Sequence, residues 1–194
     1  MLAIVIDASV LFSIRLFDPP AQLRLLSRLS RQLKLRLLVP EVAYREFMEK
    51  RFETEAQRLK ALEDAIGDVE KQVWVQSLTS SLIGAMDIGA EIKGRFAKWE
   101  PLWRKSMEES IQRLGIRVIE QKGADLRPVL DDYFAGRGAF RAKRDRRDFP
   151  DAFILQALRG LAFDAILLTA DDQLAKVANS EGRATAVSLD AVLK

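Results

Sequence analysis

The first seven residues constrain the fold of this chain more than any other stretch. Leu2 to Ile6 form a short, unbroken apolar run rich in Ile and Val, which is typical of a strand covered on both faces of a parallel sheet. Asp7 follows directly, and an ionised carboxylate at the end of a buried strand is costly unless something binds it. Ligands of open α/β sheets bind at the carboxyl ends of the strands. Asp7 is therefore a candidate functional residue.

Further apolar runs alternate with helical patterns along the rest of the chain. The patterns predict strands at 35–39, 116–119, 165–169 and 185–188, and helices within 19–35 and at about 44–66, 125–134, 150–158 and 173–178. Such alternation predicts an α/β fold, with a parallel sheet and right-handed crossovers.

The helix predicted within 19–35 is amphipathic, with basic residues on its outer face. Its leucines are expected to face the core and its arginines water: Leu25, Leu26, Leu29 and Leu33 on one face, and Arg24, Arg28 and Arg31 on the other.

Residues 67–114 are predicted to be entirely helical, with Gly115 as a C-terminal stop. Trp99 and Trp103 fall on apolar stripes, which favours core packing over base stacking. A chain of 194 residues, 48% of them hydrophobic, is expected to form one domain, 1–194, with a helical insertion at about 65–112.

The N-terminal apolar run is too short to span a bilayer and is interrupted by Asp7. We therefore expect no signal peptide, no membrane anchor and a cytoplasmic location.

The chain contains no His and no Cys. This excludes Ser-His-Asp and Cys-His nucleophile systems, imidazole acid–base catalysis and an ordinary structural zinc site. Carboxylates or lysines must carry any catalysis, and carboxylates prefer hard cations such as Mg²⁺ or Mn²⁺. The net charge of +3 is mildly favourable to a polyanionic partner.

Four acidic residues fall where strands end or the next helices begin: Asp7, Glu46, Asp151 and Asp171. All four are expected at the carboxyl edge of the sheet, where they would repel one another unless divalent cations bind between them. Asp148 and Asp172 are further candidates for the same site.

Four segments resemble the PIN-domain nucleases: DASVLF at 7–12, VPEVAYREF at 39–47, FPDAFILQAL at 149–158 and ILLTADDQL at 166–174. The resemblance implies a PIN-like three-layer fold, with a central parallel sheet of four to five strands in the order 3-2-1-4-5. It also implies cleavage of single-stranded RNA with Mg²⁺ or Mn²⁺ and a metal-activated water. Asp7, Glu46, Asp151 and Asp171 would be the catalytic, metal-binding acids, and Ser9 would support the Asp7 loop.

Two features depart from the family pattern. Gln173 stands where the family often places a further acid, with Asp172 as a candidate substitute. The helical insertion also makes the chain longer than the compact toxin-like members.

Each acid also has a purely structural interpretation. Asp7 and Asp171 suit turn or helix caps. Asp151 beside Pro150 stabilises a helix dipole by about 0.3–1 kcal/mol, and Asp148 shares that explanation.

The run RAKRDRRD at 141–148 precedes two of these acids. Its basic residues are Arg141, Lys143, Arg144, Arg146 and Arg147. They either bind the phosphates of an entering strand or form a solvated loop.

These features predict a metal-dependent endoribonuclease, and several alternatives remain. The enzyme is a candidate toxin restrained by an antitoxin protein, a processing or decay enzyme, or a nuclease acting on DNA. A catalytically idle PIN scaffold that binds RNA or protein is the alternative outside enzymes, and a homodimer is a further expectation.

Overall fold

The computed structural model describes residues 2–14, 19–70, 94, 98–121, 125–140, 146–186 and 188–192. The chain divides into two compact units, one formed by Met1–Met48 with Glu108–Lys194 and the other by Glu49–Met107. A single domain with an insertion at about 65–112 stays a prediction.

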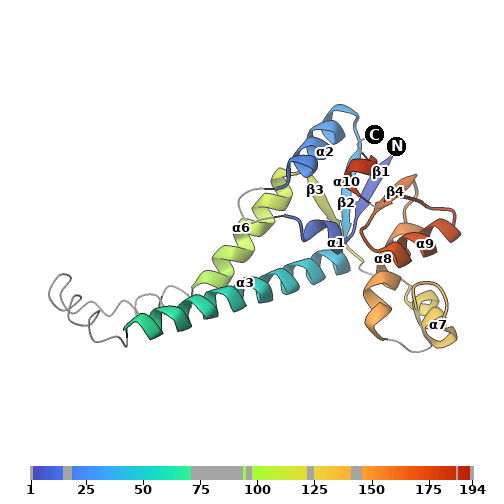
Figure 1. Cartoon of the computed structure of the whole chain (residues 1–194). Coiled ribbons are helices and arrows are strands. Elements are labelled where there is room, and N and C mark those ends of the chain that lie inside the picture. Colours follow the sequence, from blue (N-terminus) through green and yellow to red (C-terminus); the bar gives the residue numbers. More distant parts are fainter. Residues whose placement is uncertain are drawn as a thin grey trace. The chain divides into compact units, whose positions relative to one another are not determined.

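The first unit contains a five-stranded parallel sheet (Figure 1). Its strands are β1 (Ala3–Ile6), β2 (Arg36–Pro40), β3 (Ile116–Ile119), β4 (Ala165–Leu168) and β5 (Ala184–Ala186). The strand order is β3-β2-β1-β4-β5, and every pairing is parallel. The predicted fold class and strand order are confirmed.

The apolar N-terminal run forms the central strand. All four residues of β1 are buried, and Val5 lies opposite Leu38 of β2 on one side and Leu167 of β4 on the other. Ile6 pairs with Leu168, so that Asp7 and Thr169 leave the sheet at the same point. A backbone hydrogen bond of 3.0 Å from the Asp7 N–H to the Leu168 carbonyl fixes this exit.

Helices follow the strands as the sequence pattern predicts. They are α1 (Ala8–Leu11), α2 (Ala21–Gln32), α3 (Glu41–Glu70), α6 (Trp99–Arg113), α7 (Arg127–Ala135), the 3₁₀ turn η1 (Arg146–Asp148), α8 (Phe149–Arg159), α9 (Asp172–Ser180) and α10 (Leu189–Val192). Helix α2 covers one face of the sheet and α8 and α9 the other (Figure 1). The connection from β1 to β2 and the connection from β4 to β5 move in opposite directions across the sheet. Right-handed crossovers therefore place the helices of these two connections on opposite faces.

Helix boundaries depart from the pattern in small ways. Strand β2 ends at Pro40, and α3 begins at Glu41, earlier than the predicted start at about residue 44. Gly115 follows the end of α6 with a φ of 75°, a left-handed conformation that glycine adopts without strain. Among the described residues, no helix has the length and apolar character needed to cross a membrane.

The predicted buried face of α2 is partly wrong. Leu23 and Leu26 are buried, together with Ser27, whereas Leu25 is 46% exposed and Leu33 is 64% exposed. The leucines of this segment occupy more than one side of the helix, so the register of its contacts with neighbouring elements selects the face that is buried.

The second unit, taken by itself, contains an aromatic cluster. The ring of Phe52 lies 5.5 Å from the rings of both Trp99 and Trp103. Trp103 is fully buried, as predicted, while Trp99 is half-buried. Arg104 donates hydrogen bonds to Glu49 and Glu100 beside this cluster.

Candidate active site

The Asp7 carboxylate is held at the carboxyl end of β1 by donors of its own loop. It caps α1 and accepts hydrogen bonds from the Ala8 N–H at 2.6 Å and the Ser9 N–H at 3.4 Å. The Ser9 hydroxyl donates to Asp7 Oδ2 at 2.5 Å. Asp7 is only 5% exposed, so the capping interpretation is correct and places a nearly buried carboxylate at the sheet edge.

Thr169 connects the ends of β1 and β4. Its hydroxyl donates to Asp7 Oδ2 at 2.8 Å and accepts from the Asp171 N–H at 3.0 Å. The Ser9 hydroxyl also accepts from the Ala170 N–H at 3.0 Å. These bonds tie the Asp7 loop to the loop that carries Asp171.

Asp171 is the N-cap of α9. Its Oδ1 accepts from the Gln173 N–H at 2.7 Å and the Leu174 N–H at 2.9 Å. Capping by Asp171 is therefore realised, as for Asp7. Gln173, which departs from the family pattern, contributes its backbone N–H to this cap, while Asp172 is exposed.

Asp151 lies in the first turn of α8 and is electrostatically coupled to the other acids. Burial and, after it, the negative charges of Asp171, Asp7, Asp148 and Glu46 together raise its pKa to about 7. The like-charge contribution to this shift arises only when other carboxylates are close. Acids from separate segments of the chain therefore gather at one edge of the sheet.

The structure distinguishes Glu46 from its neighbours on α3. Glu41 pairs with Arg45 at 2.6 Å, and Glu49 pairs with Arg104 at 3.2 Å. The charge of Glu46 raises the pKa of Asp151. Helix α3 therefore contributes Glu46 to the group of interacting acids.

Asp148 and Asp172, the two further candidates, lie in different surroundings. Asp148 is buried in η1 and makes no side-chain hydrogen bond as N-cap of α8, and its charge also acts on Asp151. Asp172 is exposed and is not among the groups that shift that pKa. The described geometry thus favours Asp148 as the additional acid.

Sequence reasoning did not single out Thr169. It is fully buried, and its hydroxyl is the direct link between Asp7 and the backbone of Asp171. The available signal was its position: a polar residue that directly follows β4, level with the aspartate that follows β1.

The sequence profile of the PIN domain matches residues 4–173. The chain belongs to the PIN domain family. PIN domains are generally nucleases, which supports a phosphodiester hydrolase. No curated protein and no solved structure gives a significant match to the chain.

The donor set of this PIN domain suits a hard divalent cation, because every candidate ligand is a carboxylate oxygen. Within the described residues, no group of three or more acids is arranged closely enough to hold a metal ion. Besides burial, the charges of four other acids raise the pKa of Asp151, so negative charge accumulates here, and a cation would relieve it. The residues therefore fit the ion by chemistry and charge.

The predicted basic run precedes the site. Arg141, Lys143 and Arg144 lie outside the described residues. Arg146 and Arg147 are exposed in η1, immediately before the buried Asp148. The two described arginines therefore directly precede the segment that supplies Asp148 and Asp151.

Proposed function

We propose that this PIN domain is a divalent-metal-dependent endoribonuclease that cleaves single-stranded RNA. One observation carries the proposal: Asp7, Glu46 and Asp171, which come from three other segments of the chain, act together with the neighbouring Asp148 on the carboxylate of Asp151. A structural role for each acid taken singly does not require this convergence. Family membership supports the same chemistry.

Asp7, Glu46, Asp151 and Asp171 are proposed to hold Mg²⁺ or Mn²⁺. When bound, the metal would lower the pKa of a water nucleophile and stabilise the leaving oxygen of a phosphodiester. Asp148 adds negative charge beside them. The chain has no histidine, so no imidazole moves a proton in this proposal. Because the nucleophile is water, no covalent intermediate with the protein forms.

Ser9 and Thr169 are proposed as positioning residues. Both hydroxyls donate to the same oxygen of Asp7, which leaves the orientation of that carboxylate little freedom. Partners that orient a ligating group in this way matter nearly as much as the ligands. The α9 amides do the same for Asp171.

The basic run 141–147 is proposed to bind the phosphates of the substrate as it reaches the acids. Guanidinium groups bind phosphate oxygens through charge-assisted, often paired hydrogen bonds. The exposure of Arg146 and Arg147 is compatible with this role. Two further parts of the proposal concern the biological setting: the enzyme is a toxin restrained by an antitoxin protein, or it forms a homodimer. They need tests of their own.

The test measures cleavage of a labelled, unstructured RNA by the purified full chain with Mn²⁺, Mg²⁺ or excess chelator. We expect cleavage that needs the metal and is lost in Asp7→Asn. Asp172→Asn is the matched control, because it removes an exposed acid from the same edge of the sheet. Circular dichroism checks that both variants are folded.

Two results would contradict the proposal. Equal cleavage by Asp7→Asn and the wild type, or cleavage that persists in excess chelator, removes the metal mechanism. If the matched DNA is cleaved faster than the RNA, the substrate is DNA and the assignment of RNA is wrong.

The alternative of an idle scaffold draws on Gln173, where the family often keeps an acid. Calorimetry separates it from the enzyme, because a scaffold shows no divalent-ion binding that depends on Asp7. For the biological role, growth arrest on expression that a neighbouring gene product relieves would indicate a toxin.

A further inference from the structure

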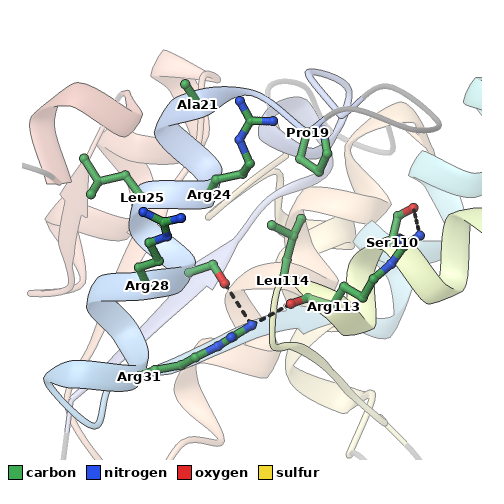
Figure 2. Close-up of a pocket in the computed structure, with 10 residues that line it drawn as sticks. Pro19, Ala21, Arg24, Leu25, Arg28, Arg31, Ser110, Arg113 and Leu114 are labelled. Atoms are coloured by element: carbon green, nitrogen blue, oxygen red, sulfur yellow. Dashed lines mark hydrogen bonds between the residues drawn. The ribbon is translucent and has the colours of Figure 1, made fainter.

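A groove of about 410 Å³ lies between α2 and the C-terminal end of α6, within the first unit (Figure 2). We call it the arginine groove; its polar lining consists of Arg24, Ser27, Arg28, Arg31, Ser110 and Arg113. None of the acids of the candidate active site lines it. The sequence pattern predicted only a solvated helix face for the α2 arginines.

Neutral groups hold two of these arginines in place. Arg31 donates to the backbone carbonyl of Arg113 at 2.6 Å and to the Ser27 hydroxyl at 3.4 Å. Figure 2 shows Arg31 reaching from α2 to Arg113. Arg113 itself donates to the Ser110 hydroxyl at 3.3 Å. These contacts orient the guanidinium groups without compensating their charge.

Several arginines elsewhere in the described chain are paired with carboxylates. Arg104, Arg127 and Arg159 each form ion pairs with carboxylates. Within the described residues, neither Arg28 nor Arg31 has a carboxylate in ion-pair distance, and the groove lining contains no acidic residue. A guanidinium cannot lose its proton to relieve the repulsion. The groove therefore carries positive charge that an external anion would neutralise.

We propose that the arginine groove binds the phosphate backbone of the RNA substrate outside the cleavage site. This rests on the proposed function. Arginine forks and serine hydroxyls are the groups that contact phosphates. No aromatic residue lines the groove, so it offers bases no stacking platform. Recognition here would be independent of sequence.

The direction of the groove agrees with this role. Helix α2 returns the chain from the carboxyl end of β1 to the amino end of β2, so its first turn lies toward the edge of the sheet that carries the acids. Arg24, Arg28 and Arg31 span roughly 10 Å along the helix axis, which is enough for more than one phosphate. A strand in the groove would therefore be directed toward the acid edge.

The test measures binding of a fluorescein-labelled 20-nucleotide oligouridylate by anisotropy, in chelator, with the Asp151→Asn chain. Under these conditions no cleavage is needed, so a failure of the groove is distinguishable from a failure of the nuclease. We expect Arg28→Glu to weaken binding about fivefold at 50 mM salt. The slope of log affinity against log salt should become shallower by about 0.7, the value for one phosphate on a single strand.

Arg183→Glu is the matched control, because Arg183 lies before β5 and does not line the groove. It should change the binding and the slope less than Arg28→Glu does. Equal effects of the two charge reversals would show that Arg28 acts only through the net charge of the protein, which would overturn the proposal. So would unchanged binding in Arg28→Glu.

A second arm uses a labelled glutamate-rich peptide of the same length. Tighter binding of this peptide than of the RNA, lost in Arg28→Glu, would make the groove a docking site for an acidic protein segment and overturn the RNA assignment. Weak peptide binding that ignores Arg28 supports it.

Discussion

The acid edge of the sheet and the arginine groove are two accumulations of like charge, and the protein treats them differently. At the acid edge, burial and the neighbouring carboxylates together raise the pKa of Asp151 to about 7, so a proton relieves part of the repulsion. In the groove, Arg31 is held by a carbonyl and a hydroxyl, and its proton cannot leave. The first site can neutralise itself, whereas the second needs an anion from outside.

This difference assigns metal-dependent chemistry to the acid edge and the binding of an anion to the arginine groove. A carboxylate whose pKa lies near neutrality exchanges its proton for a cation, and metal affinity then depends on pH. A permanently charged groove contributes salt-dependent attraction that is the same for every sequence. Substitutions at the two sites should therefore affect different measurements.

The largest effect is expected at the acid edge. Asp151→Asn removes the carboxylate on which the other four act, and the rate of RNA cleavage should fall at least ~100-fold, beyond the cost of losing a supporting partner. Single-turnover cleavage in Mn²⁺ measures it. Arg28→Gln, assayed in parallel, should keep the wild-type rate at saturating RNA; a comparable loss in both would erase the distinction between the sites.

Thr169→Val tests the positioning of Asp7. It keeps the shape of a buried side chain but removes the hydroxyl that donates to Asp7 Oδ2 and accepts from the Asp171 N–H. Metal affinity or cleavage rate should fall about 10–100-fold, measured by Mn²⁺ titration. Thr169→Ser restores the hydroxyl and should recover most of the loss. Failure of the serine variant to recover activity would point to packing as the role of Thr169.

The sequence predicted the sheet well because its determinants are local. An unbroken apolar run such as Leu2–Ile6 needs cover on both faces, and that requirement makes β1 central. Asp7 and Asp171 were predicted as candidates because Asp7 directly follows a strand and Asp171 lies in the turn after another. By contrast, the exposure of Leu25 was not predictable, since leucines lie on several sides of α2 and tertiary contacts chose among them.

Thr169 and the arginine groove were missed for a related reason. The importance of Thr169 lies in a hydrogen bond between residues 162 positions apart, and threonine at the end of a strand is common. The groove depends on Arg113 lying beside α2, which no pattern within one helix encodes. Contacts between distant segments are what the sequence alone did not reveal.

The pH dependence of stability tests the charge at the acid edge. The folded chain holds the Asp151 proton up to about pH 7, whereas the unfolded chain releases it near pH 4. Between these values the folded state binds more protons, so stability falls as pH rises. For this half-buried group we expect a loss on the order of 1–2 kcal/mol after solvent screening.

In metal-free protein, that loss should lower the Tm of the wild type by roughly 2–8 °C between pH 5 and pH 8, relative to Asp151→Asn. Thermal denaturation followed by circular dichroism measures it. Added Mn²⁺ should restore more of the Tm at pH 8 than at pH 5, because ligands must be deprotonated. Parallel curves for wild type and variant would contradict the coupling of these acids.

The smallest effect is expected from combining the two basic regions. Arg146 lies beside the acids and Arg28 lies in the groove, so each glutamine variant should weaken the binding of long RNA about two- to threefold, roughly one phosphate contact each. If the regions contact different phosphates, the double variant should show the product of the two factors, since separate sites behave additively. An RNA too short to reach the groove should respond to Arg146→Gln alone. A short RNA that is equally sensitive to Arg28→Gln would place both arginines on the same phosphate and merge the two regions into one binding surface.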